Sequence, residues 1–188
     1  NTLKADRPLF DDWFVNLAII SDTVLELREI PIPVGPQGGA RPGSIDIFGK
    51  GNQRIFNQNL ITSVSFIKGD TAFRPPDWEI RLTPVINYNN VRGKENRALL
   101  INPADGKIRK DEHIALQEAF VDYHIRNVSD RYDFDSIRVG IQPLILDFRG
   151  FLFQDQQLAI RLFGNRKNNI WQYNIGWFRR IEKTPILA

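Results

Sequence analysis

Three arginines, Arg81, Arg138 and Arg161, each lie on the polar side of a segment in which apolar and polar residues alternate. A guanidinium group stays charged and presents several N–H donors to carboxylates and phosphates. Amide groups on the same polar sides offer neutral hydrogen bonds, and they belong to Gln142, Gln172 and Asn174. Such side chains bind polar solutes or water. The sequence therefore predicts a solute-contacting surface in which the three arginines attract anions.

Catalysis and metal binding find little support in the sequence. Cysteine is absent, and the two histidines, His113 and His124, are eleven residues apart, which places them on opposite faces of a regular strand. Asp130, Asp133 and Asp135 cluster, but their spacing differs from that of a calcium-binding EF-hand loop. No phosphate-binding loop and no Gly-x-Ser-x-Gly nucleophile turn occurs. We expect no catalytic residue, no metal, no cofactor and no enzyme activity.

We expect strands to position these side chains, because apolar and polar residues alternate with a period of two, the pattern of a β-strand, in much of the sequence. The alternation is clearest from Ile170 to Ile181, where Trp171, Tyr173, Ile175 and Trp177 alternate with small or polar residues. Residues 78–88 alternate as clearly, and Pro84 on their apolar side predicts a bulge or a break in pairing.

Weaker alternation predicts further strands at residues 13–27, 59–67, 113–126, 136–141 and 158–162. Helix is an alternative at residues 13–27 and 116–121. A slip between Leu116 and Ala119 predicts a β-bulge. The expected connections are a Pro/Gly-rich loop at 30–52, a polar loop at 89–111, a short turn at 127–133, an irregular stretch at 143–153 and a hairpin turn at 164–169.

The resulting fold class is all-β, an antiparallel meander of about seven or eight strands. Residues 1–55 are interpreted as an N-terminal strand with the Pro/Gly-rich loop. Residues 56–188 are interpreted as the hairpins, which form either a single domain or part of a larger barrel.

Aromatic residues near the strand ends favour a membrane over water around the apolar sides. They are Trp78, Tyr88, Trp171, Tyr173 and Trp177, and in a barrel such residues sit at the membrane–water boundary. A strand of about ten residues is roughly 33 Å long, and tilted by about 40° it climbs roughly 25 Å, the height of the apolar band of a barrel. We therefore expect a segment of a transmembrane β-barrel, in which the six polar residues named above line the lumen.

Three consecutive segments carry a resemblance to a known group of proteins. Leu116–Asp122 reads Leu-Gln-Glu-Ala-Phe-Val-Asp, Ile137–Pro143 reads Ile-Arg-Val-Gly-Ile-Gln-Pro, and Leu158–Gly164 reads Leu-Ala-Ile-Arg-Leu-Phe-Gly. In this order, within residues 113–183, they resemble bacterial outer-membrane porins, alginate-export-type barrels above all. The resemblance implies location in the outer membrane and passive transport or polymer export. It implies membrane lipid as a partner, and seven or eight strands suggest a larger barrel or one completed by other chains.

Two other functions remain open at this point. A soluble exported β-sandwich could bind carbohydrate through Trp78, Trp171 or Trp177, and a structural subunit could join a cell-surface assembly. Nucleic acid is not an expected partner, because the 25 basic and 22 acidic residues are interspersed and the net charge is only +3.

Overall fold

The computed structural model describes residues 1–29, 49–69, 75–95, 99–100, 102–131, 133–147 and 149–181. These residues form one sheet of seven antiparallel strands, which confirms the expected all-β meander. The strands are β1 (Trp13–Glu29), β2 (Gly49–Lys68), β3 (Trp78–Glu95), β4 (Ile108–Asn127), β5 (Phe134–Ile145), β6 (Gln154–Arg166) and β7 (Trp171–Arg179). A single 3₁₀ turn, η1 (Pro103–Asp105), precedes β4.

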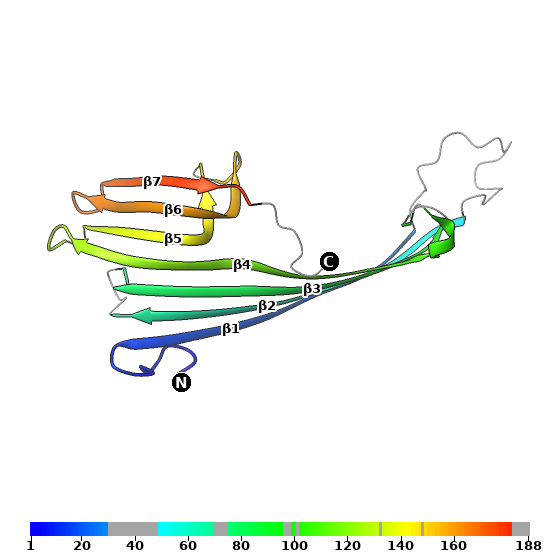
Figure 1. The fold of residues 1–188 in the computed structure, drawn as a ribbon, viewed down its shortest axis with the longest axis horizontal. Coiled ribbons are helices and arrows are strands. Elements are labelled where there is room, and N and C mark those ends of the chain that lie inside the picture. Colours follow the sequence, from blue (N-terminus) through cyan, green and yellow to red (C-terminus); the bar gives the residue numbers. More distant parts are fainter. Residues whose placement is uncertain are drawn as a thin grey trace.

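Each strand pairs only with its neighbours in the sequence, in the order β1 to β7 (Figure 1). The sheet is not closed, so β1 and β7 each pair with one strand. Part of the β1 edge is nevertheless covered. The Ala5 amide donates to the Val15 carbonyl at 2.9 Å, and the Leu17 amide donates to the Leu3 carbonyl at 2.9 Å.

One face of the sheet, here called the apolar face, carries an unbroken apolar row across all seven strands. In register the row is Val15, Phe66, Ile80, Val121, Val139, Ile160 and Trp177. Val15 is buried, but the other six are exposed, from 38% for Phe66 to 65% for Trp177. No second layer of the described residues packs against this row.

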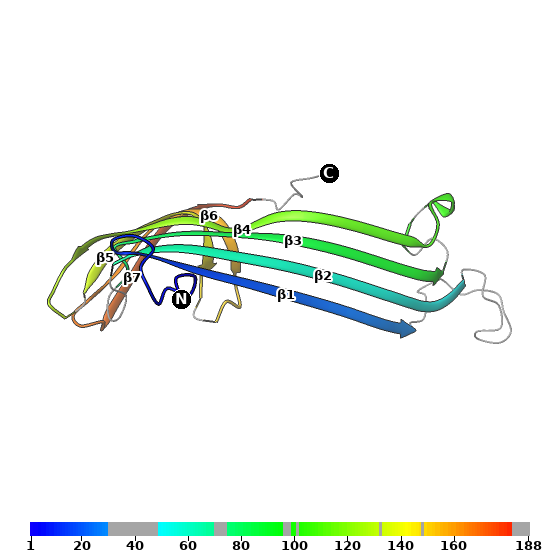
Figure 2. The same ribbon diagram turned by 90° about the horizontal axis from the view of Figure 1, so that it is seen from below.

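The opposite face, here called the polar face, is the more sheltered one. Asp122 is 3% exposed and Ser136 is fully buried, whereas Ile80 and Val139 on the apolar face are half exposed. Figure 2 shows the sheet as an arch, with the turned end of the β5–β6 hairpin beneath it. Phe153 of that hairpin stacks on Phe178 at 6.0 Å, and Phe178 belongs to the polar face by register. This arrangement reverses the usual order of a soluble sheet, which buries its apolar side.

Several strands are longer than the alternation predicts. β2 begins at Gly49, inside the loop expected at 30–52, and the remainder of that loop lies outside the described residues. The loop expected at 89–111 is wrong at both ends, because β3 continues to Glu95 and β4 begins at Ile108. Hydrogen bonds between side-chain amides of β2 and β3 support the extension. The Asn57 amide donates to Asn89, and the Asn87 amide donates to Asn59. This ladder offsets the poor strand propensity of asparagine.

The structure also bears on the predicted bulge, on the helix alternatives and on the predicted boundary between residues 55 and 56. The register shifts at Thr83 and Pro84, where β4 carries the extra residue Gln117, so the predicted bulge is confirmed. Both helix alternatives are wrong, because residues 13–27 and 116–121 are strand. The boundary between residues 55 and 56 lies inside β2. No helix in the described part of the chain is long and apolar enough to span a membrane.

Gly140 allows β4 and β5 to approach closely on the polar face. Its φ of +125° is a conformation that L side chains rarely adopt. A Cβ atom at this position would lie 2.2 Å from the Ala119 carbonyl oxygen and 2.7 Å from the Phe120 Cα. Because both neighbours are backbone atoms, the clash can be relieved only by moving a strand.

Replacing Gly140 with alanine should therefore destabilise the sheet. We expect G140A to lower the free energy of unfolding by about 1–3 kcal/mol, as measured by urea denaturation followed through tryptophan fluorescence. Gly176→Ala is the matched control, because a Cβ there would meet no atom closer than 3.8 Å. G176A should change the stability by less than about 0.5 kcal/mol, and equal effects of the two variants would contradict the strain at Gly140.

Candidate functional site

Strands β3, β4 and β5 bring two arginines and three carboxylates together on the polar face. Arg81 contacts Glu79 at 2.6 Å and Glu118 at 3.5 Å, while Arg138 contacts Asp122 at 2.7 Å and Glu79 at 3.9 Å. The sequence places these groups at alternate positions, and the register sets Glu79 beside Asp122 and Asp122 beside Arg138. Sheltered charges are tolerated when they are paired in this way.

Aromatic rings hold the guanidinium groups against the sheet. The Arg81 guanidinium lies 5.4 Å from the Phe120 ring centre, and that of Arg138 lies 4.3 Å from the same ring. Phe163 continues the series, 5.7 Å from Arg138 and 4.6 Å from Arg161. Each contact adds a cation–π attraction, which is stronger where water is excluded.

Arg161 differs from the other two arginines because it forms no ion pair with any described residue. Its Nε atom is buried and has no hydrogen-bond partner there. Gly176 is its register partner on β7, and the absence of a side chain at Gly176 leaves space beside the Arg161 stem. The guanidinium charge of Arg161 is therefore not paired with a described carboxylate, and open space lies beside it.

That space is a pocket of about 490 Å³ between β5, β6 and β7. Arg161, Gln172 and Asn174 line it, so three of the six residues predicted to contact solute come together. Phe134 and Phe163 supply aromatic walls, and Asn165 and Asn169 supply further amides. An unpaired cation, several amides and aromatic surface can bind a polar or anionic solute weakly and release it.

The remaining predicted residues have other roles. Gln142 was expected to be accessible, but it is fully buried, and its amide donates to the carbonyls of Arg138 at 3.2 Å and Ala159 at 3.0 Å. It therefore secures the bend of the β5–β6 hairpin. Arg81 and Arg138 are neutralised by the carboxylates described above. The expected attraction for anions thus narrows from three arginines to Arg161.

The predicted boundary aromatics lie on the apolar face or at its margins. The Trp78 ring lies 4.4 Å from the Tyr123 ring at a tilt of 40°, and the Tyr88 ring lies 6.1 Å from the Phe56 ring, at opposite ends of the apolar segment of β3. Trp171 and Trp177 are exposed on β7. The Tyr173 hydroxyl donates a hydrogen bond to Asp135 at the strand end.

A second polar cluster joins the β4–β5 turn to the β6–β7 turn. Asp133 accepts hydrogen bonds from the Ser129 hydroxyl at 3.0 Å and from the backbone amides of Asn168 at 3.2 Å and Asn169 at 3.3 Å. Lys167, Asn168 and Asn169 all have positive φ, which aims successive amides at the carboxylate. Although burial raises the pKa of Asp133, these hydrogen bonds outweigh it and lower the pKa below its ordinary value.

Sequence reasoning placed Glu79, Glu118 and Asp122 on polar sides of strands but did not pair them with the arginines, and it missed the roles of Phe120 and Phe163. Their alternate spacing was visible, but the partners become evident only when the strand register is known. Among the described residues, no group of three or more His, Asp or Glu side chains is placed to hold a metal ion.

No family model, curated protein or solved structure matches the chain.

Asp133 should make the stability of the joined turns depend on pH. Because its pKa is lowered in the folded state, its contribution is fully present above the unfolded value of about 3.9 and is lost as the pH falls through the folded value. We expect D133N to be less stable than the wild type at pH 7, and this difference in unfolding free energy should shrink towards pH 3. Urea denaturation across this range measures it, and a difference that is constant with pH would contradict the assignment.

Proposed function

We propose that this chain forms part of the wall of an outer-membrane β-barrel, with the polar face lining a channel for passive transport. The distribution of polarity over the two faces carries the proposal. Apolar side chains are exposed across all seven strands, while charged side chains are sheltered and paired on the other face. Lipid is the surrounding that suits such an apolar face, and a water-filled lumen suits the polar one.

The dimensions of the apolar segment agree with this proposal. On β3 it extends from Trp78 to Tyr88, which is roughly 33 Å of strand and roughly 25 Å of height at a tilt of about 40°. Beyond Tyr88 the same face turns polar, with Asn90, Arg92 and Lys94. An aromatic residue at each end of an apolar segment is typical of a strand that spans a membrane.

The two edge strands of the sheet indicate that the proposed barrel needs additional strands. β1 and β7 each lack a strand partner on one side within the described residues. Unpaired backbone groups are not tolerated in the hydrocarbon layer. Further strands must therefore pair with the β7 edge and with the part of the β1 edge that residues 3–5 leave free. These strands come from the same protein or from other chains.

The same open edges favour one alternative, a structural subunit whose edge strands pair with a neighbouring protein at the cell surface. Copurification of a partner at a fixed ratio, without channel activity, would support it. The sandwich alternative has less support, because it needs two packed sheets and the described residues form one.

A charge placed on the apolar face distinguishes lipid from water. Leu82 is 49% exposed on this face. If it faces lipid, L82R should cost about 2–4 kcal/mol in vesicle-based urea unfolding and should reduce the amount in the outer-membrane fraction. If it faces water, the cost should stay within about 0.5 kcal/mol.

Asn90→Arg provides the control for L82R, because Asn90 lies on the same face of the same strand beyond Tyr88. N90R should leave stability and membrane location unchanged. Recovery of the native protein in the soluble fraction without detergent would contradict the barrel itself.

Arg161 should set the ion selectivity of the channel without holding the fold together. We expect R161Q to shift the reversal potential in planar bilayers towards cation selectivity, with unchanged insertion and stability. R138Q should instead destabilise the protein, because it leaves Asp122 buried beside only more distant cations.

Lys107→Gln is the control for net charge, because this exposed residue lies in the β3–β4 connection and away from the pocket. K107Q should shift the reversal potential much less than R161Q. Equal shifts, or none with R161Q, would remove Arg161 from the proposed channel.

A further inference from the structure

Basic side chains gather on the apolar face where β2, β3 and β4 continue past the aromatic pair Phe56 and Tyr88. This basic patch consists of Arg54, Arg92, Lys94 and Lys110, all of which are exposed. Arg54 and Arg92 are direct register partners, and Lys110 is the partner of Asn90, the next residue along this face. The patch therefore extends across three neighbouring strands.

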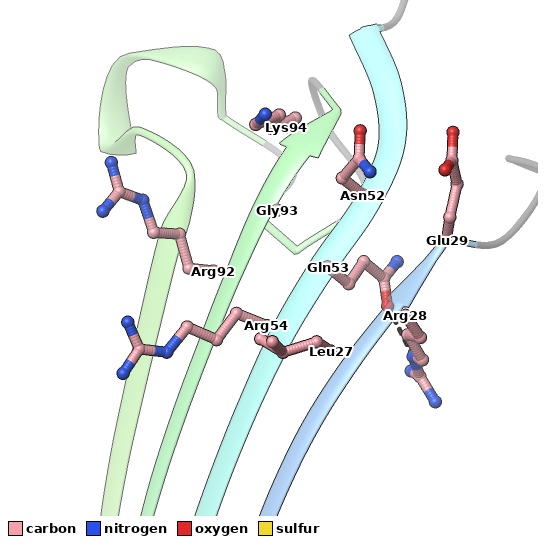
Figure 3. A pocket seen from close by; sticks show the side chains of 9 residues that line it. All are labelled: Leu27, Arg28, Glu29, Asn52, Gln53, Arg54, Arg92, Gly93 and Lys94. Carbon is pink, nitrogen blue, oxygen red and sulfur yellow. Dashed lines mark hydrogen bonds between the residues drawn. The ribbon is translucent and has the colours of Figure 1, made fainter.

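Arg54, Arg92 and Lys94 line a pocket of about 410 Å³, whose other lining residues are Leu27, Arg28, Glu29, Asn52, Gln53 and Gly93. Figure 3 shows Arg54 and Arg92 extending in the same direction from adjacent strands, while Arg28 extends away from them. Each of these guanidinium groups presents several N–H donors that suit the oxygens of a phosphate group.

None of the four cations of the patch forms an ion pair with a described residue. Other basic residues at the same end of the sheet do, because Arg28 pairs with Glu26 and Arg109 pairs with Asp111. Glu29 and Glu112 are the acidic residues beside the patch on this face, so its local charge remains positive.

Apolar surface adjoins the patch directly. Leu25 and Leu27 on β1 are 60% and 75% exposed, and their register partners on β2 are Phe56 and Arg54. Arg54 lies two residues beyond Phe56, which is roughly 7 Å along the strand. In a bilayer this separation takes a group from the edge of the hydrocarbon layer into the headgroup layer.

We propose that the basic patch binds the phosphate group of an anionic membrane lipid, whose acyl chain lies against Leu25, Leu27 and Phe56. The inference rests on the proposed function, because it assigns the apolar face to lipid. It goes further by naming the lipid chemistry and the place on the barrel wall. A free phosphate ion shares the charge of this ligand but lacks the acyl chain.

The test is a titration of phosphatidylglycerol into the intact protein in neutral detergent, with bound lipid counted by native mass spectrometry. Phosphatidylcholine is titrated in parallel. We expect phosphatidylglycerol to be preferred, and R54Q/R92Q to bind it roughly tenfold or more weakly, since each basic residue contributes to the attraction of anionic lipid. Higher salt should weaken the binding of the wild type.

The control is R109Q/R131Q, which removes two exposed positive charges outside the pocket, one on the polar face of β4 and one in the β4–β5 turn, and should leave the affinity unchanged. R54K/R92K preserves charge and should retain most of the affinity, which separates loss of charge from loss of fold. Unchanged binding by R54Q/R92Q, or an equal loss in R109Q/R131Q, would overturn the proposal.

Inorganic phosphate distinguishes the two sources of the ligand. It should not displace phosphatidylglycerol at equal concentration, and efficient displacement would show a site for free phosphate instead of lipid. Flotation of the protein with liposomes tests the barrel separately. A protein that floats but shows no effect of R54Q/R92Q refutes only the lipid site, whereas a protein that stays in solution refutes the proposed function.

Discussion

The apolar face of the sheet is the constraint on which the rest of the structure depends. Seven strands present apolar side chains on this side, and the register row across them is exposed at every position except Val15. Apolar surface of this extent is unfavourable in water. A surrounding that removes this face from water would stabilise the fold, and the proposed location in a membrane would supply one.

The polar face must then supply the side-chain contacts that an apolar core provides elsewhere. Glu79, Asp122 and Arg138 are sheltered, and each is held by ion pairs with its register neighbours. Phe120 and Phe163 separate the arginines, which limits repulsion between like charges. Because the carboxylates are committed to Arg81 and Arg138, Arg161 is left as the cation available to a solute.

The sequence predicts the strands wherever one face is apolar, because the period of two is then visible, as in residues 171–177. It fails where both faces are polar. The outer parts of β2 and β3 are strand because Asn57, Asn59, Asn87 and Asn89 bond across the ladder, a feature that no local pattern reveals. The candidate site was predicted only in part for the same reason. Alternation identifies a polar residue such as Gln142, but burial beneath a bent hairpin decides whether a solute can reach it.

The meander also determines how such a wall can change in size. Every strand bonds only to its neighbours in the sequence, so no long connection links distant parts of the sheet. Addition of one hairpin at an edge would widen the sheet by about 10 Å, at about 4.8 Å per strand, and would leave every existing register intact. Duplication or loss of a hairpin is thus a single genetic step that changes the circumference while it preserves the pairing of the remaining strands.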